Sequence, residues 1–154
     1  MVFTNPQRRL KAALQVIADR AHEPPASALA AAIEEMLRYA AEDDLVTGMS
    51  ATRLRLVATV PALQAAALRR VAAAAGRLTD AVHAAYPAEL DEDSAAVLVG
   101  AVLGAALTAS IVSLRRSNPP AEVAASVRRA TAIVTRRLQS SQHGIQPEGP
   151  KVRG

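Results

Sequence analysis

The chain of 154 residues contains no cysteine and no tryptophan, and aromatic residues make up only 2% of it. Without cysteine the chain has no thiol nucleophile, no disulfide and no cysteine-based zinc or iron–sulfur site. It also lacks a glycine-rich phosphate-binding loop, and no serine or carboxylate pair stands in a sequence context typical of catalysis. We therefore expect a protein that is not an enzyme and that carries no cofactor.

The few histidines do not suggest a metal site either. His22, His83 and His143 are scattered along the chain, and no two of them have the spacing of metal ligands. The acidic residues in segment 89–93 lack the pattern of a calcium-binding loop. They are better suited to the start of a helix, where carboxylates interact favourably with the helix dipole. We expect no bound metal.

A signal peptide and a single basic face are both missing from the sequence. The N-terminus has no basic stretch followed by an apolar segment, which favours a cytoplasmic protein. The net charge is +4, but the arginines occur as pairs spread along the chain, and neighbouring residues of a helix point about 100° apart. Such pairs belong to solvated helix faces and do not form a DNA-binding stripe. Arginine in place of lysine, with abundant alanine, suggests a GC-rich bacterial genome.

The pattern of apolar residues predicts helices throughout. Alanine supplies much of the 51% hydrophobic content and is the strongest helix former. Apolar residues recur at helical spacing, and proline interrupts the pattern at Pro24, Pro61 and Pro87. We predict an all-α protein with helices at about residues 5–23, 26–42, 50–59, 61–85, 94–114 and 121–139, and a loop at 43–48. The length fits one helical domain over residues 1–140, followed by a disordered tail over residues 141–154.

The predicted helix at residues 94–114 carries no charged residue and contains Gly100 and Gly104. A helix that is apolar on every side cannot face water, so a second copy or another protein must cover it. The two small glycines would let another helix approach closely, as in a soluble four-helix bundle. A transmembrane helix is the alternative, since the length permits it. Alanine, serine, threonine and glycine make up much of the segment, which favours soluble helix packing.

The order of these segments resembles the C-terminal region of TetR-family transcriptional regulators. The resemblance is carried by residues 53–63, the uncharged helix 94–114 and residues 118–122, which open the final helix. It implies an all-α effector-binding domain of about six helices, in which the last two helices form a four-helix-bundle interface in a homodimer. It also implies a regulator, usually a repressor, in which a small-molecule effector alters DNA binding by an N-terminal helix-turn-helix domain. That segment is absent from this chain, so we do not expect the chain to bind operator DNA specifically.

The resemblance directs attention to two sets of residues. For the dimer interface we expect Val97, Gly100, Leu103, Gly104, Val123, Val127, Ala130, Val134 and Leu138. For the effector pocket we expect Met36, Tyr39, Met49, Val57, Val60, Leu107, Thr108 and Ile111. Tyr39 is the strongest pocket candidate, because a buried tyrosine brings a hydroxyl that needs a partner. Ordinary core packing is the alternative role for each pocket candidate.

The sequence leaves three questions open. It does not decide which face of the uncharged helix meets the partner. The scarcity of aromatic residues suggests a small or aliphatic cavity and not a stacking site for planar compounds. Two other functions compete with the regulator: a stand-alone helical protein–protein interaction module, and a small membrane protein, which the composition favours least.

Overall fold

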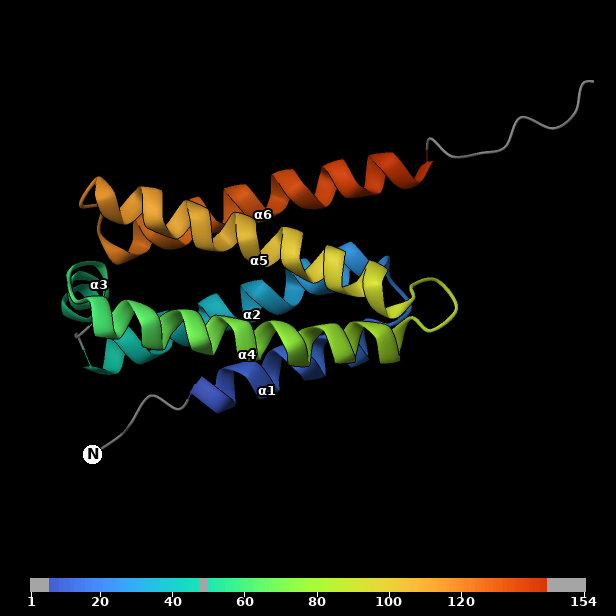
Figure 1. The fold of residues 1–154 in the computed structure, drawn as a ribbon, viewed down its shortest axis with the longest axis horizontal. Coiled ribbons are helices and arrows are strands. Elements are labelled where there is room, and N and C mark those ends of the chain that lie inside the picture. Colours follow the sequence, from blue (N-terminus) through green and yellow to red (C-terminus); the bar gives the residue numbers. More distant parts are fainter. Residues whose placement is uncertain (1–5, 48–49, 144–154) are drawn as a thin grey trace, which may run out of the picture.

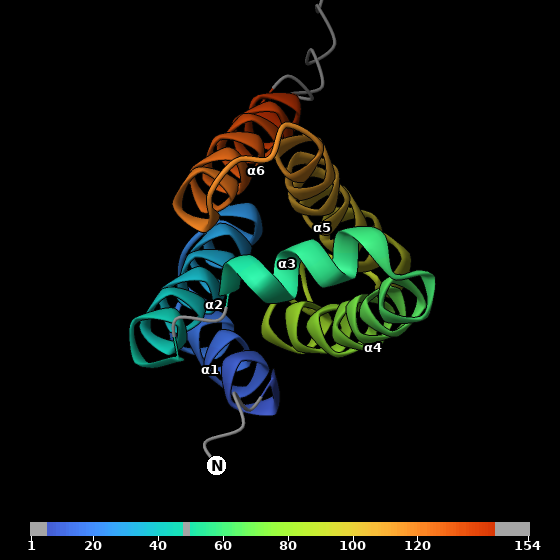
Figure 2. The ribbon, with the colours of Figure 1, turned by 90° about the vertical axis from the view of Figure 1, so that its left-hand side faces the viewer.

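A computed structural model of the chain describes residues 6–47 and 50–143, which form six α-helices and no strand. The helices are α1 (Pro6–Asp19), α2 (Pro25–Thr47), α3 (Ser50–Thr59), α4 (Pro61–Ala85), α5 (Glu92–Arg115) and α6 (Pro120–His143). The all-α prediction is therefore confirmed. Five of these helices run lengthwise beside one another, while α3 lies across one end (Figures 1 and 2). Contacts link α1 to α2 and α4, α5 to α4 and α6, and α2 to α6, so the long helices form a ring.

The helix boundaries follow the proline positions, with two differences. Residues 43–47, expected to be a loop, continue α2. The reason is tertiary: Arg9 of α1 donates a hydrogen bond from Nε to Oδ2 of Asp43 at 3.0 Å, which anchors this additional turn. Helix α6 continues to His143, into the segment expected to be a disordered tail. Residues 144–154 lie outside the described part of the chain, so the tail stays a prediction.

One end of the bundle is closely packed. This packed end comprises the second half of α1, the first half of α2, the second half of α4 and the first half of α5. Its fully buried side chains come from all four helices and include Ile17, Leu29, Leu78, Val82 and Val99. Leu78 and Val82 are four residues apart, so they lie on the same face of α4. Burial of such aliphatic side chains supplies most of the driving force for folding.

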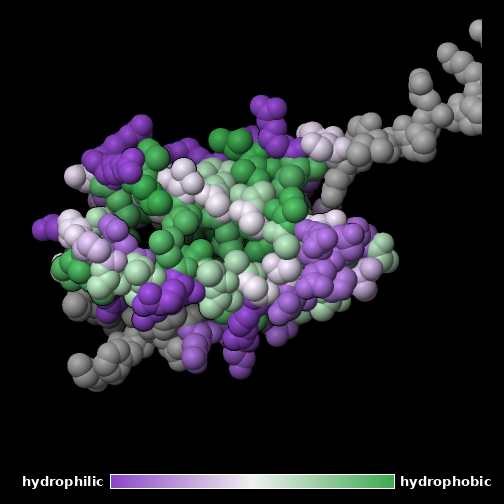
Figure 3. All heavy atoms as spheres, in the orientation of Figure 1, coloured by the Kyte–Doolittle hydropathy of each residue, from purple (hydrophilic) through white to green (hydrophobic). Residues whose placement is uncertain are grey.

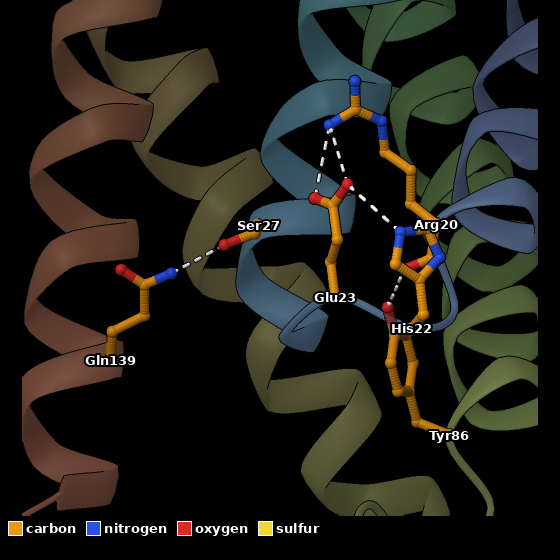
Figure 4. Close-up of polar contacts among 6 residues, drawn as sticks. All are labelled: Arg20, His22, Glu23, Ser27, Tyr86 and Gln139. Carbon is orange, nitrogen blue, oxygen red and sulfur yellow. Dashed lines mark hydrogen bonds and ion pairs between the residues drawn. The ribbon is translucent and has the colours of Figure 1, made fainter.

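Tyr86 joins α4 to α1 at the packed end. The residue is only 2% exposed, and its hydroxyl donates a hydrogen bond to the backbone oxygen of Arg20 at 2.9 Å (Figure 4). Burial raises the pKa of Tyr86, with smaller contributions from the negative charges of Glu89 and Glu23. The raised pKa keeps the phenol in its neutral, hydrogen-bond-donating form.

Polar contacts close the surface around the packed end. Arg20 forms an ion pair with Glu23 at 3.2 Å, in the turn that follows α1 (Figure 4). On the other side, Gln139 donates from Nε2 to Oγ of Ser27 at 2.7 Å, which ties the last part of α6 to the first turn of α2. The contact between Gln139 and Ser27 joins segments that are distant in the sequence, whereas the Arg20–Glu23 pair is local to the turn between α1 and α2.

The opposite end of the bundle is less filled. This hollow end comprises α3, the start of α1, the end of α2, the first half of α4, the end of α5 and the start of α6. Leu56 of α3 and Leu63 and Leu68 of α4 remain 45%, 40% and 54% exposed. Leu68 continues the apolar stripe of Leu78 and Val82, yet it is not covered. Helix α3 meets the start of α4 at a bend of 105°. The same stripe of α4 is thus buried in one half and open in the other.

Candidate ligand cavity and dimer surface

A cavity of about 560 Å³ lies at the hollow end, between α1, α2, α3, α5 and α6. It is lined by Arg9, Leu37, Ala40, Ala41, Arg53, Leu54, Ser110, Pro120, Ala121, Val123, Ala124 and Val127. Its volume falls within the range of about 300–1,000 Å³ that is common for small-molecule sites. Most of the lining is apolar and only a few polar side chains reach it, which is the usual composition of a ligand pocket.

Small side chains create this space. Leu37, Ala40 and Ala41 are three and four residues apart, so they share one face of α2. Ala121 and Ala124 stand on the facing side of α6. Alanine forms a helix wall without filling the volume in front of it. Helix α3 lies across this end of the bundle (Figure 2) and closes the cavity with Arg53 and Leu54. Apolar side chains also gather around a hollow on the face formed by α4 and α5 (Figure 3).

Two arginines bring positive charge to the cavity. Arg9 reaches it from the first turns of α1 and Arg53 from α3. Arg9 forms an ion pair with Asp43, and the two side chains are 27% and 32% exposed. The third polar group, Ser110, donates its hydroxyl to the backbone oxygen of Ala106 at 2.8 Å, so its donor is already used within α5.

The turn between α5 and α6 positions one wall of the cavity. Ser113 is buried at 2% exposure, and its Oγ accepts a hydrogen bond from Nδ2 of Asn118 at 2.9 Å. Between them, Ser117 adopts a left-handed backbone conformation with φ of 56°. Helix α6 then begins at Pro120, as expected from the tolerance of proline in the first turn of a helix. This geometry places Pro120 beside the end of α5.

None of the expected effector-binding residues that the structure describes lines this cavity. Met36 is half-buried and packs against the core, and Val57, Val60 and Leu107 are half-buried as well. Thr108 is exposed and Ile111 is 42% exposed. Met49 lies outside the described residues. Leu37 and Ala40 line the cavity, whereas Met36 and Tyr39, their neighbours in the sequence, do not. One step along a helix rotates the direction of the side chain by about 100°.

Tyr39 has a different environment from the one we expected. Its ring lies beneath the guanidinium groups of Arg38 and Arg8, at 4.6 Å and 5.5 Å from the ring centroid. These are cation–π contacts on a half-buried ring. The tyrosine that is buried and uses its hydroxyl internally is Tyr86.

The residues expected at the dimer interface fall into two sets in the structure. Some are exposed on α5, and the others are packed inside the protomer. Val97 is 68% exposed, and Gly100 and Gly104 follow it on the same open face of α5. A Cβ atom added to either glycine would meet no atom within 4 Å. Thr108 and Ile111 extend this open face toward the end of the helix. We call these five residues the α5 stripe.

The remaining interface candidates lie further inside the protomer. Val123 and Val127 are only 7% and 5% exposed, because they face the other helices of the same chain and line its cavity. Leu103, Val134 and Leu138 pack against the core, and Ala130 is half-buried. On α6 the large apolar side chain that is exposed is Ile133, at 53%. Within the protomer, the open face of α5 is the one that carries Val97 and the two glycines. That this face meets a partner stays a prediction.

Helix α5 is long and apolar enough to cross a membrane by length and composition, and only 22% of its most apolar window is buried in the protomer. Taken together as one bent span, α3 and α4 pass the same test. The exposed apolar surface of α5 therefore needs a cover that this single protomer does not supply.

In the described residues, no group of three or more histidine, aspartate or glutamate side chains lies close enough together to hold a metal ion. In the same part of the chain, every buried side-chain nitrogen or oxygen atom has a hydrogen-bond partner. The cavity is therefore the feature that distinguishes the hollow end from ordinary packing.

Comparison with known families gives one match. Residues 23–139 match the family model TetR_C_14, described as the MftR C-terminal domain. The matched segment begins just before α2 and ends in the last turns of α6, so it includes both the cavity walls on these helices and the α5 stripe. No curated protein and no solved structure shows a significant match to the chain.

Proposed function

The chain belongs to the TetR family of regulators, as a C-terminal domain of the MftR type, and we propose that it binds a small apolar effector at the hollow end and forms a homodimer through α5 and α6. C-terminal domains of this family belong to transcriptional regulators, which supports a regulatory and not an enzymatic role. We further propose that it acts in the bacterial cytoplasm as part of a repressor, whose DNA binding the effector would alter.

The observation that carries the dimer proposal is the α5 stripe. Exposed valine and isoleucine flank two glycines that have open space above them. Small residues at such positions allow two helices to approach closely. Two copies of the stripe, related by a twofold axis, would cover one another because the same surface patch serves on both sides.

The cavity supports the effector proposal. It has the volume and the apolar lining of a small-molecule site, and its walls come from five different helices. A ligand in this position would contact α1 through Arg9, α3 through Leu54 and α6 through Val123. It would therefore change the relative stability of different helix arrangements, provided that it binds one of them more tightly. Helix α1 is the element through which a preceding DNA-binding domain would respond.

The dimer proposal is tested by replacing Gly104 with leucine. In the protomer an added Cβ would meet no atom within 4 Å, and Gly104 is exposed, so the fold should tolerate the side chain. At a close helix–helix contact, the leucine would separate the two copies. Size-exclusion chromatography with light scattering should give a mass near twice 16.1 kDa for the unmodified chain and a monomer or aggregate for Gly104→Leu.

Gly76→Leu is the matched control for this experiment. Gly76 is also a helical glycine with nothing within 4 Å of an added Cβ, but it lies on α4, away from the α5 stripe. It should leave the dimer intact. A Gly104→Leu protein that remains a normal dimer would contradict the interface. If the unmodified chain stays in solution only with detergent, the membrane alternative for α5 would be favoured instead.

A further inference from the structure

We infer that the effector carries an anionic group, and that Arg9 recognises it by exchanging its bond to Asp43 for a bond to the ligand. This inference rests on the proposed function, because it assigns a ligand class to the same cavity. It identifies Arg9 as the residue that sets specificity there.

The first argument is the charge of the lining. Among the described residues, the charged side chains that reach the cavity are Arg9 and Arg53, and none of the lining side chains is acidic. The rest of the surface is dominated by alanine, leucine, valine and proline. A site of this kind suits a molecule with an aliphatic part and an anionic end, since the few polar groups of an apolar pocket fix the orientation of its ligand.

The second argument is that the bond between Arg9 and Asp43 can be given up at little cost. Both side chains remain partly exposed, at 27% and 32%, and ion pairs of this kind contribute little to stability. Asp43 accepts hydrogen bonds from both Nε and Nη2 of Arg9, but with one oxygen, Oδ2. A ligand carboxylate could instead bind the guanidinium group with both of its oxygens, through two parallel hydrogen bonds. The ligand would therefore compete effectively with Asp43.

The position of Arg9 links recognition to the regulator's output. The residue belongs to α1, whereas Asp43 belongs to the last turns of α2. The bond between them is one of the polar contacts that hold the start of α1 in place. When a ligand group takes the hydrogen bonds of Arg9 from Asp43, the start of α1 is bonded to the ligand and no longer to α2. The packed end is not disturbed, because Tyr86 still bonds to Arg20 at the other end of α1.

The experiment compares octanoate with octanol, which share a chain and differ in charge, by isothermal titration calorimetry. We expect the unmodified chain to bind octanoate about tenfold more tightly than octanol, the size expected for one charge-assisted hydrogen-bond pair. Arg9→Met should remove this preference, so that the variant binds the two probes about equally tightly. Arg77→Met is the matched control, because Arg77 is an exposed arginine of α4 that does not line the cavity, and it should keep the preference.

Asp43→Asn gives a second, independent variant, should Arg9→Met fail to fold. Loss of the competing charge should tighten octanoate binding by about threefold and leave octanol binding unchanged. Equal binding of the two probes, or a preference that survives Arg9→Met, would overturn the role of Arg9 and leave the apolar cavity of the proposed function standing. Failure of both probes to bind would overturn the inference together with the cavity's role, while the dimer measured with Gly104→Leu would be unaffected.

Discussion

The two ends of this bundle are built from the same helices but differ in what fills them. At the packed end, Leu78 and Val82 of α4 are fully buried; at the hollow end, Leu68 of the same helix is 54% exposed. The difference does not come from hydrophobicity, since the residues are equally apolar. It lies in the packing around them: Leu78 and Val82 belong to the buried core, whereas α3 lies across the hollow end and alanines line the cavity there. One end therefore holds the core, and under the proposed function the other would hold the ligand.

The largest expected effect tests this division directly within α4. Leu78→Ala should lower the free energy of unfolding by about 2–5 kcal/mol, because it removes buried methyl groups and leaves a cavity. Leu68→Ala, ten residues earlier in the same helix, should change it by less than about 0.5 kcal/mol, because the side chain is already half in solvent. Urea unfolding followed by circular dichroism, at one protein concentration, measures both. Similar losses for the two variants would show that the ends are packed alike.

A smaller effect is expected at the polar connection of the packed end. Tyr86→Phe keeps the buried ring and removes only the hydroxyl that donates to the backbone oxygen of Arg20. The loss should be about 1 kcal/mol, the typical net value of one hydrogen bond. Tyr39→Phe is the control at the other tyrosine, whose ring contacts two arginines, and it should be close to neutral. An equal loss in both variants would contradict a special role for Tyr86.

The contrast between the two tyrosines also shows how much of the structure could be predicted from the sequence. The sequence predicted the helices well, because alanine content, apolar spacing and proline positions are local signals. Boundaries of α3 and α4 agreed with the structure, and the family resemblance is confirmed by the match over residues 23–139. The burial of Tyr86 and the contacts of Tyr39 with two arginines had no such local signal. Burial depends on which helices meet, and that is decided by tertiary contacts.

The cavity could not be located from the sequence for a related reason. The expected residues Met36 and Tyr39 lie on α2 next to those that line the cavity, Leu37 and Ala40. A shift of one residue turns a side chain by about 100°, so the pattern could point to α2 without indicating which of its faces lines this cavity. Arg9 and Arg53 gave no signal either, since each belongs to an arginine-rich stretch that resembles a solvated face. Only the crossing of α3 brings them to one space.

The smallest expected effect compares the two ends of α5. At the packed end the helix begins with Asp91, whose side chain accepts a hydrogen bond from the backbone nitrogen of Ser94 at 2.8 Å. Hydrogen bonding to Ser94 lowers the pKa of Asp91, so this cap is already in its favourable ionised form at neutral pH. At the hollow end the chain leaves α5 through Ser117, with φ of 56°. That conformation is strained for any residue with a Cβ atom and free of strain for glycine.

Ser117→Gly should therefore stabilise the protein, by about 0.5–1 kcal/mol after allowance for the greater freedom of glycine in the unfolded chain. Ser117→Ala is the matched control, because alanine keeps the Cβ atom and hence the strain, and it should lie within about 0.5 kcal/mol of the unmodified chain. Thermal unfolding monitored by circular dichroism compares the three proteins. A glycine variant no more stable than the alanine variant would mean that the backbone conformation of Ser117 does not lower the stability of the protein. The two ends of the bundle would then differ only in how closely their side chains are packed.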